Sequence, residues 1–94
     1  MTSKVLKINY LGKSRLINFK LLNKYKKYLI DKGSITINGV SLTISKIFNE
    51  GFQISIVPHT LKLTNLVNLQ TGDSVNIEFD VLGKYIKNFI KNEN

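Results

Sequence analysis

The sequence is most informative at residues 34–45, which read SITINGVSLTIS. Polar and apolar residues alternate on both sides of Asn38-Gly39, the dipeptide that two-residue hairpin turns favour because both turn positions need positive φ. The stretch therefore predicts a β-hairpin with a return strand over Val40–Ile47. Side chains two apart on a strand share a face. The two faces of the return strand are then formed by Val40, Leu42 and Ile44, and by Ser41, Thr43 and Ser45.

Alternating runs recur on both sides of this hairpin. Lys4–Tyr10 and Arg15–Leu21 are separated by the turn Leu11–Ser14, and further runs follow at Phe52–Ile56 and Ser74–Asp80. The residues expected to point inward are Leu6, Ile8, Tyr10, Ile17, Phe19, Leu21, Phe52, Ile54, Ile56, Val75, Ile77 and Phe79. About six short strands joined by short turns are typical of a small antiparallel barrel.

Three segments depart from the period of two. Leu22, Tyr25 and Leu29 have helical spacing, which predicts a helix of about two to three turns that ends at Lys32-Gly33, with Gly33 as a left-handed cap. Pro58–Asn65 reads as a short helical turn followed by a loop. Asp80 is a plausible N-cap for a final amphipathic helix over residues 81–94, whose apolar stripe is Leu82, Tyr85, Ile86, Phe89 and Ile90.

Composition narrows the class of protein. The chain has 94 residues, no cysteine and a formal net charge of +8. It contains neither a signal peptide pattern nor an apolar run long enough to cross a bilayer, so we expect a cytoplasmic protein without a membrane partner. The positive charge raises the alternative of a nucleic-acid-binding barrel. Because the lysines are dispersed and the phenylalanines of the strands are expected to point inward, we predict no nucleic-acid partner.

Few residues offer catalytic chemistry by themselves. One histidine, His59, and scattered carboxylates give no metal-ligand spacing. A triad of Ser41, His59 and Asp80 lacks the glycines that surround an exposed nucleophile. The distinctive feature is that Ser41 and Thr43 share one strand face, with Thr60 following Pro58 at another strand end. Hydroxyls both donate and accept, which suits a polar heterocycle or a polyol, although the same pattern also describes a solvated strand face.

Three blocks carry a resemblance to a known family. KGSITINGVSLT at residues 32–43, IVPHTL with TNL at residues 56–66, and GDSVNIE at residues 72–78 are similar, in order and spacing, to the riboflavin synthase family. The resemblance covers nearly the whole chain and is to the second of the family's two barrels. It implies an all-β fold, a six-stranded antiparallel Greek-key barrel with a short helix between strands and a C-terminal amphipathic helix. We expect residues 1–80 to form this second repeat, with its first strand truncated, and 81–94 to form the helix.

The resemblance also implies an activity. The family is a transferase that converts two molecules of 6,7-dimethyl-8-ribityllumazine, by transfer of a four-carbon unit, into riboflavin and a ribitylamino-pyrimidinedione. It needs no metal and no redox cofactor. Its subunits form a trimer through the terminal helices, so we expect either a homo-oligomer or a first-barrel partner. The chain lacks the first barrel, and the alternative is a non-catalytic lumazine- or flavin-binding module.

Site residues follow from the matched motifs. The resemblance implies that Ser41 and Thr43 are catalytic, by hydrogen bonding to the ring or by assisting addition to it. It implies that Thr60, with Val57 and Pro58, holds the edge of the heterocycle, and that His59 is a loop residue beside it. Gly39 and Val40 would let the ligand approach the backbone, and Lys32 and Asn38 would lie near the ribityl chain. Asn38 departs from the aspartate common in the family, and its neutral amide cannot act as a base.

Overall fold

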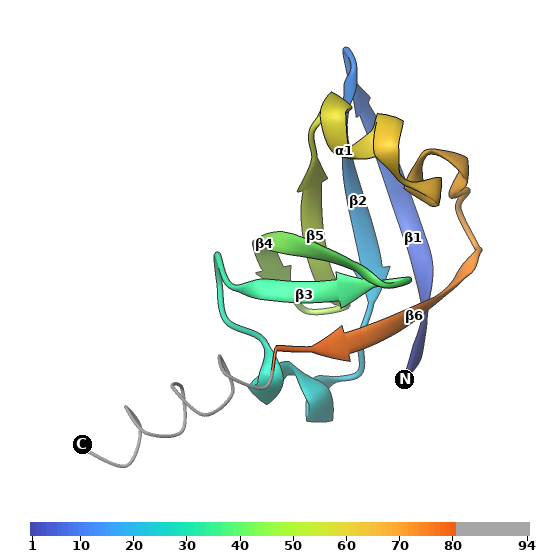
Figure 1. Ribbon diagram of the computed structural model, residues 1–94. Coiled ribbons are helices and arrows are strands. Elements are labelled where there is room, and N and C mark those ends of the chain that lie inside the picture. Colours follow the sequence, from blue (N-terminus) through green and yellow to red (C-terminus); the bar gives the residue numbers. More distant parts are fainter. Residues whose placement is uncertain (81–94) are drawn as a thin grey trace.

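Six antiparallel strands form a closed barrel in the order β1-β2-β5-β4-β3-β6 (Figure 1). The structure is a computed structural model, and it describes residues 1–80. Its elements are β1 (Thr2–Leu11), β2 (Ser14–Lys20), the 3-10 helix η1 (Asn23–Tyr28), β3 (Ser34–Ile37), β4 (Val40–Phe48), β5 (Gly51–Ile56), α1 (Pro58–Leu63), the 3-10 helix η2 (Asn65–Asn68) and β6 (Ser74–Phe79).

The connections define a Greek key. Strands β3, β4 and β5 follow one another as hairpins, and the chain then runs through α1 and η2 before β6 returns beside β3. Three consecutive strands with a fourth beside the first is the Greek-key arrangement. The predicted all-β, six-stranded antiparallel barrel is therefore confirmed, and the predicted helical turn after Pro58 is α1.

The hairpin at residues 34–45 forms as its sequence predicts. Asn38 and Gly39 have φ angles of 48° and 83°, and Ile37 pairs with Val40 across the turn. Asn38 also fastens the turn to β6. Its N–H donates to the carbonyl of Asn76 at 2.8 Å, and its side-chain Oδ1 accepts from the N–H of Asn76 at 2.8 Å.

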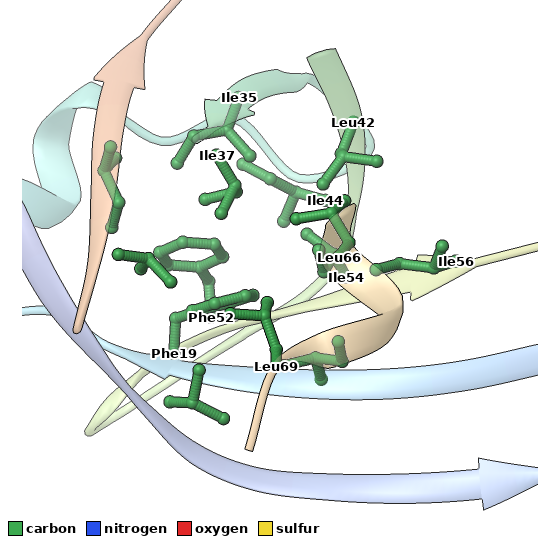
Figure 2. Packing of buried hydrophobic residues seen from close by; sticks show 14 of the residues in the cluster. Phe19, Ile35, Ile37, Leu42, Ile44, Phe52, Ile54, Ile56, Leu66 and Leu69 are labelled. Carbon is green, nitrogen blue, oxygen red and sulfur yellow. The ribbon is translucent and has the colours of Figure 1, made fainter. Parts of the chain in front are cut away.

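The barrel interior is filled by the inward faces predicted for β2, β4, β5 and β6. The rings of Phe19 and Phe52 are fully buried and stack with centroids 5.4 Å apart (Figure 2). Leu66 of η2 is also fully buried and belongs to the same cluster. The connection between β5 and β6 is thus anchored in the core, and this anchor holds α1 over one end of the barrel.

The prediction for the inward face of the first strand is confirmed at Ile8, which packs against the core, and is wrong at Leu6 and Tyr10. Val5 is the residue that is buried, whereas Leu6 and Ile8 are half-buried and Tyr10 is 65% exposed. The pairing of β1 with β2 shifts register between Val5 and Lys7, which marks a bulge or irregularity. An extra residue in one strand reverses which alternate side chains point inward. Beyond this shift Tyr10 shares a strand face with Ile8, and it is exposed because it lies near the tip of the β1–β2 hairpin, past the core.

The segment after β2 also differs from its prediction. The helix is a 3-10 helix that ends at Tyr28, and Leu29 is extended and buried. The residue with positive φ is Lys32, at 65°, and not Gly33. Gly33 is instead required for space, because a Cβ there would lie 2.9 Å from the carbonyl oxygen of Ile30.

Pairing of β1 with β6 closes the barrel. Thr2, Ser3 and Lys4 pair with Asn76, Val75 and Ser74. The truncation of the first strand relative to the family stays a prediction, and the terminal helix predicted for residues 81–94 lies outside the described residues. Among residues 1–80, no helix is long and apolar enough to cross a membrane.

Candidate functional site

Strands β4 and β5 separate at one end of the barrel. Their pairing runs from Phe48 with Gly51 to Ile44 with Ile54, and the remainder of β4 pairs with β3 alone. In Figure 1, β5 rises toward α1 while β4 runs across the barrel with β3. Ser41 and Thr43 of β4, and Val57 at the end of β5, all lie beyond the last pair of these two strands.

The backbone of β4 points toward the divergence at two positions. The N–H of Ile44 donates to the carbonyl of Gly33 at 2.8 Å, and its carbonyl accepts from the N–H of Lys32 at 3.1 Å, so the peptide groups of Ile44 face β3. Peptide groups alternate in direction along a strand. Those of Ser41 and Thr43 therefore point to the opposite edge, where the pairing with β5 ends. Beyond the last pair, Ile44 with Ile54, the peptide groups of Ser41 remain for a ligand to hydrogen-bond.

The outer face of the β3–β4 hairpin is lined by hydroxyls. Ser34 lies opposite Thr43 and Thr36 lies opposite Ser41, and we call these four residues the hydroxyl patch. Ser41 and Thr43 are exposed, whereas Leu42 and Ile44 beside them are buried, as the alternation predicts. Within residues 1–80 the side chains of Ser41 and Thr43 make no hydrogen bond, so both hydroxyls are available to a ligand.

The end of β5 supplies the second group of predicted residues. Val57 is the N-cap of α1 and is 53% exposed, and Pro58 occupies the first turn, where its missing N–H costs nothing. Thr60 is half-buried; its carbonyl accepts a hydrogen bond from Thr64 Oγ1 at 2.8 Å, and its own hydroxyl bonds to no described residue. Leu61 is buried and fixes α1 to the core.

The structure does not bring Lys32 and Asn38 together. They lie on either side of β3, and four extended residues span about 13 Å. The Lys32 ammonium donates to the carbonyl of Ser45 at 2.6 Å, at the end of β4 remote from the turn. Asn38 is held by Asn76 at the other end. Lys32 and Asn38 thus lie at opposite ends of β3, and the expectation that both contact the ribityl chain stays a prediction.

Gly39 and Val40 follow Asn38, and each is explained by a different feature of the fold. A Cβ at Gly39 would meet nothing within 4 Å, so glycine is required there by its φ of 83° and not by a close protein neighbour. Val40 follows and is half-buried against the core. That Gly39 and Val40 let a ligand approach the backbone, as the resemblance implies, stays a prediction.

His59 faces a different surface. A hollow of about 730 Å³ lies between the tip of the β1–β2 hairpin and α1, and Pro58 and His59 line it together with Tyr10 and Arg15. Ser41, Thr43 and Thr60 do not line this hollow. Sequence reasoning did not identify it, because Tyr10 was expected inside the barrel. Elsewhere in residues 1–80, no three histidine or carboxylate side chains gather as metal ligands.

These features define a class: a closed Greek-key barrel whose β3–β4 hairpin carries hydroxyls beside the point where β4 and β5 diverge. Comparison with known proteins gives the family. Residues 1–80 match the family model described as the lumazine binding domain. The chain belongs to the lumazine-binding domain family, and its predicted resemblance to riboflavin synthases is confirmed.

Curated relatives carry the name riboflavin synthase. The chain is 43% identical over 89 residues to the protein of Actinobacillus pleuropneumoniae, covering 95% of this chain and 41% of the relative. It is 36% identical over 93 residues to that of Bacillus subtilis (strain 168), covering 99% and 43%. The chain thus spans less than half the length of these relatives.

Solved structures share the fold. The chain is similar to LumP complexed with riboflavin, with a TM-score of 0.79 and 18% identity, covering 86% of this chain and 44% of that one. It is also similar to LumP complexed with flavin mononucleotide, with a TM-score of 0.77 and 25% identity, covering 84% and 45%.

Proposed function

We propose that this chain is a riboflavin synthase barrel that binds 6,7-dimethyl-8-ribityllumazine where β4 and β5 diverge. The observation that carries the proposal is the placement of Ser41 and Thr43, with unengaged hydroxyls, beyond the point where β4 stops pairing with β5, whose end carries the exposed Val57. The identity of 43% to a relative named riboflavin synthase supports the same activity. The four-carbon transfer and its products are the reaction implied by the family.

Each residue contributes in a way that its environment allows. A pteridine-type ring presents carbonyls and ring nitrogens along its edge, and the main-chain groups of Ser41 match such an edge. The hydroxyls of Ser41, Thr43 and Thr60 both donate and accept, so they suit either kind of ring atom. Val57 offers an apolar surface to the ring. We assign contacts with the ribityl chain to the turn at Asn38-Gly39, because Lys32 is held at the other end of β3.

The transfer requires two bound substrates. Holding two reactants in register contributes up to about 7–11 kcal/mol to lowering the barrier. One barrel supplies one site, so we propose that the second comes from another copy of this chain, from a trimer of the family's kind, or from a complementary first barrel. Sedimentation with and without ligand tests these assemblies. The cytoplasmic location stays a prediction.

The test is a titration of the chain with 6,7-dimethyl-8-ribityllumazine, followed by ligand fluorescence and by the appearance of riboflavin. Thr43→Val removes one hydroxyl and retains shape and strand preference, and we expect it to weaken binding about tenfold, or about 1.4 kcal/mol. Thr71→Val, at the exposed turn before β6, is the matched control. Equal affinity of the two variants would remove the hydroxyl patch from the site.

Riboflavin formation separates the enzyme from a binding module. Turnover by the chain alone supports pairing between copies. If the chain binds lumazine without turnover, the next measurement is riboflavin formation by the chain mixed with the first barrel of a riboflavin synthase. Turnover restored in the mixture supports the proposal, and continued absence of turnover identifies a non-catalytic lumazine-binding module. No binding at saturating lumazine contradicts the proposed function.

A further inference from the structure

The hollow between the β1–β2 hairpin tip and α1 carries a concentration of positive charge. Lys13 and Arg15 reach it from the hairpin, and Lys62 and His59 reach it from α1. None of the carboxylates in residues 1–80 lines it. We call this surface the cationic hollow. Its volume of about 730 Å³ lies within the range of small-molecule sites.

The cations of the hollow have no counter-charge in the described part of the chain. Lys13, Arg15 and Lys62 form no ion pair with any carboxylate of residues 1–80. Like charges that share a concave surface repel one another, and a bound anion would replace this repulsion by attraction. The feature is therefore a surface for an anion and not an internal network of ion pairs.

Arg15 is held in place at the wall of the hollow by two contacts. Its Nη1 donates to the carbonyl of Val67 at 2.7 Å, and its guanidinium lies 4.9 Å from the centre of the Tyr10 ring. Arg15 is half-buried, so its position is defined from two sides. A guanidinium has five N–H donors in a fixed planar arrangement, and the bond to Val67 uses one of them. The others remain for a planar or tetrahedral oxyanion.

The hollow also has apolar walls. The ring of Tyr10 is 65% exposed, Val67 is 42% exposed, and Pro58 contributes a further apolar surface. A free inorganic ion would leave these groups uncovered, whereas a ligand with an anionic group and a ring would cover both parts of the surface. Tyr10 would stack on such a ring, and Arg15 and Lys62 would hold the anion.

We propose that the cationic hollow is a second binding site, for a small phosphate monoester that carries a ring. The site is separate from the proposed lumazine site, since Ser41, Thr43 and Thr60 do not line it. It does not depend on the proposed function. The proposed site gives a role to part of the chain's excess positive charge, which lumazine binding does not require.

Phenyl phosphate is the probe, and amide chemical shifts of the ¹⁵N-labelled full chain are the readout. We expect saturable shifts at residues 10–15, 59–62 and 67, with affinity at least about fivefold above that of inorganic phosphate. Raising NaCl from roughly 50 to 500 mM should weaken binding severalfold, because the contact is between charges. Shifts at these residues produced equally by phenol would overturn the proposal, since a neutral ring would then suffice.

Charge variants test which cations matter. Lys62→Gln is expected to weaken phenyl phosphate about threefold to tenfold, and Arg15→Lys is expected to weaken it by keeping the charge but losing the planar donors. Lys7→Gln, an exposed lysine on β1, is the control and should leave affinity unchanged. Equal affinities for Lys62→Gln and Lys7→Gln contradict the site.

Two additional measurements keep the result interpretable. Thr43→Val should leave phenyl phosphate binding intact, so failure of the lumazine site and failure of this one are distinguishable. A single-stranded oligonucleotide is the competitor. If it binds at the same residues more tightly than phenyl phosphate, with a steep salt dependence, the hollow is a nucleic-acid surface and the small-ligand proposal is overturned.

Discussion

The hydroxyl patch lies on strands β3 and β4, whereas the cationic hollow lies between α1 and the β1–β2 hairpin, and the two surfaces differ in almost every chemical respect. The patch consists of neutral side chains and strand backbone, and it lies where β4 and β5 diverge. The hollow consists of cations around an exposed tyrosine, at the tip of the β1–β2 hairpin. Neutral groups that donate and accept select an uncharged heterocycle, whereas cations with an aromatic wall select an anion. One barrel can therefore keep two ligand chemistries apart by placing them on different elements.

Both surfaces depend on the packing of β2 against β5. Phe52→Ala removes a fully buried ring that stacks on Phe19, and we expect a loss of about 3–5 kcal/mol in the free energy of unfolding. This is the largest effect expected from the changes considered, and it should abolish both binding activities together. Urea unfolding followed by circular dichroism measures it. Ser55→Ala, exposed on β5, should change stability by less than about 0.5 kcal/mol. A folded Phe52→Ala protein with intact stability would show that the two rings do not support the barrel.

The turn at Asn38-Gly39 joins β3 to β4, the two strands that carry the hydroxyl patch, and it does not line the cationic hollow. Asn38→Ala removes the acceptor for the N–H of Asn76 and places a Cβ residue without a compensating side chain at a φ of 48°. We expect a loss of about 1–2 kcal/mol in stability and a weaker affinity for lumazine, because the turn supports the start of β4.

The comparison is sharpened by the second ligand. In the folded Asn38→Ala protein, phenyl phosphate should bind as it does in the unmodified chain, because the turn does not line the cationic hollow. Asn76→Ala, which retains the N–H that Asn38 contacts, is the control and should have a smaller effect on stability. Parallel losses of both ligands in Asn38→Ala would mean that the two surfaces are coupled through the barrel.

Much of this architecture could be predicted from the sequence, for a definite physical reason. Period-two alternation reports which face of a strand is buried, and it does so for the inward residues of β2, β4, β5 and β6. The turn at Asn38-Gly39 could be predicted because few residue pairs accept positive φ twice. The prediction for the first strand failed at Leu6 because the strand contains a register shift. Such a shift changes which side chains point inward and leaves no signal in the sequence alternation, so Val5 is buried in place of Leu6.

The candidate site could be predicted only for those residues that lie close together in the sequence. Ser41 and Thr43 share a face because they are two apart, and Val57 to Thr60 follow one strand end. By spacing alone these hydroxyls are a solvated strand face, and it is the family motifs that distinguish them. The cationic hollow was missed because its walls come from segments distant in sequence, the hairpin tip and α1, which meet only in the folded barrel. Lys32 and Asn38 show the opposite case: they lie close together in one sequence motif, but β3 separates them in the fold.

His59 gives the smallest expected effect and the sharpest division between the two surfaces. The motif resemblance groups it with Thr60 at the lumazine site, whereas in the fold it lines the cationic hollow beside Lys62. We therefore expect His59→Gln to leave lumazine affinity within about twofold of the unmodified chain, since a neutral amide retains hydrogen-bonding capacity without contacting the hydroxyl patch. Thr60→Val, one residue further on, is the matched comparison and should weaken lumazine severalfold by removing a hydroxyl. Fluorescence titration of both variants measures this difference. If His59→Gln weakened lumazine as much as Thr60→Val did, α1 would present both residues to one ligand, and the separation of the two surfaces would not hold.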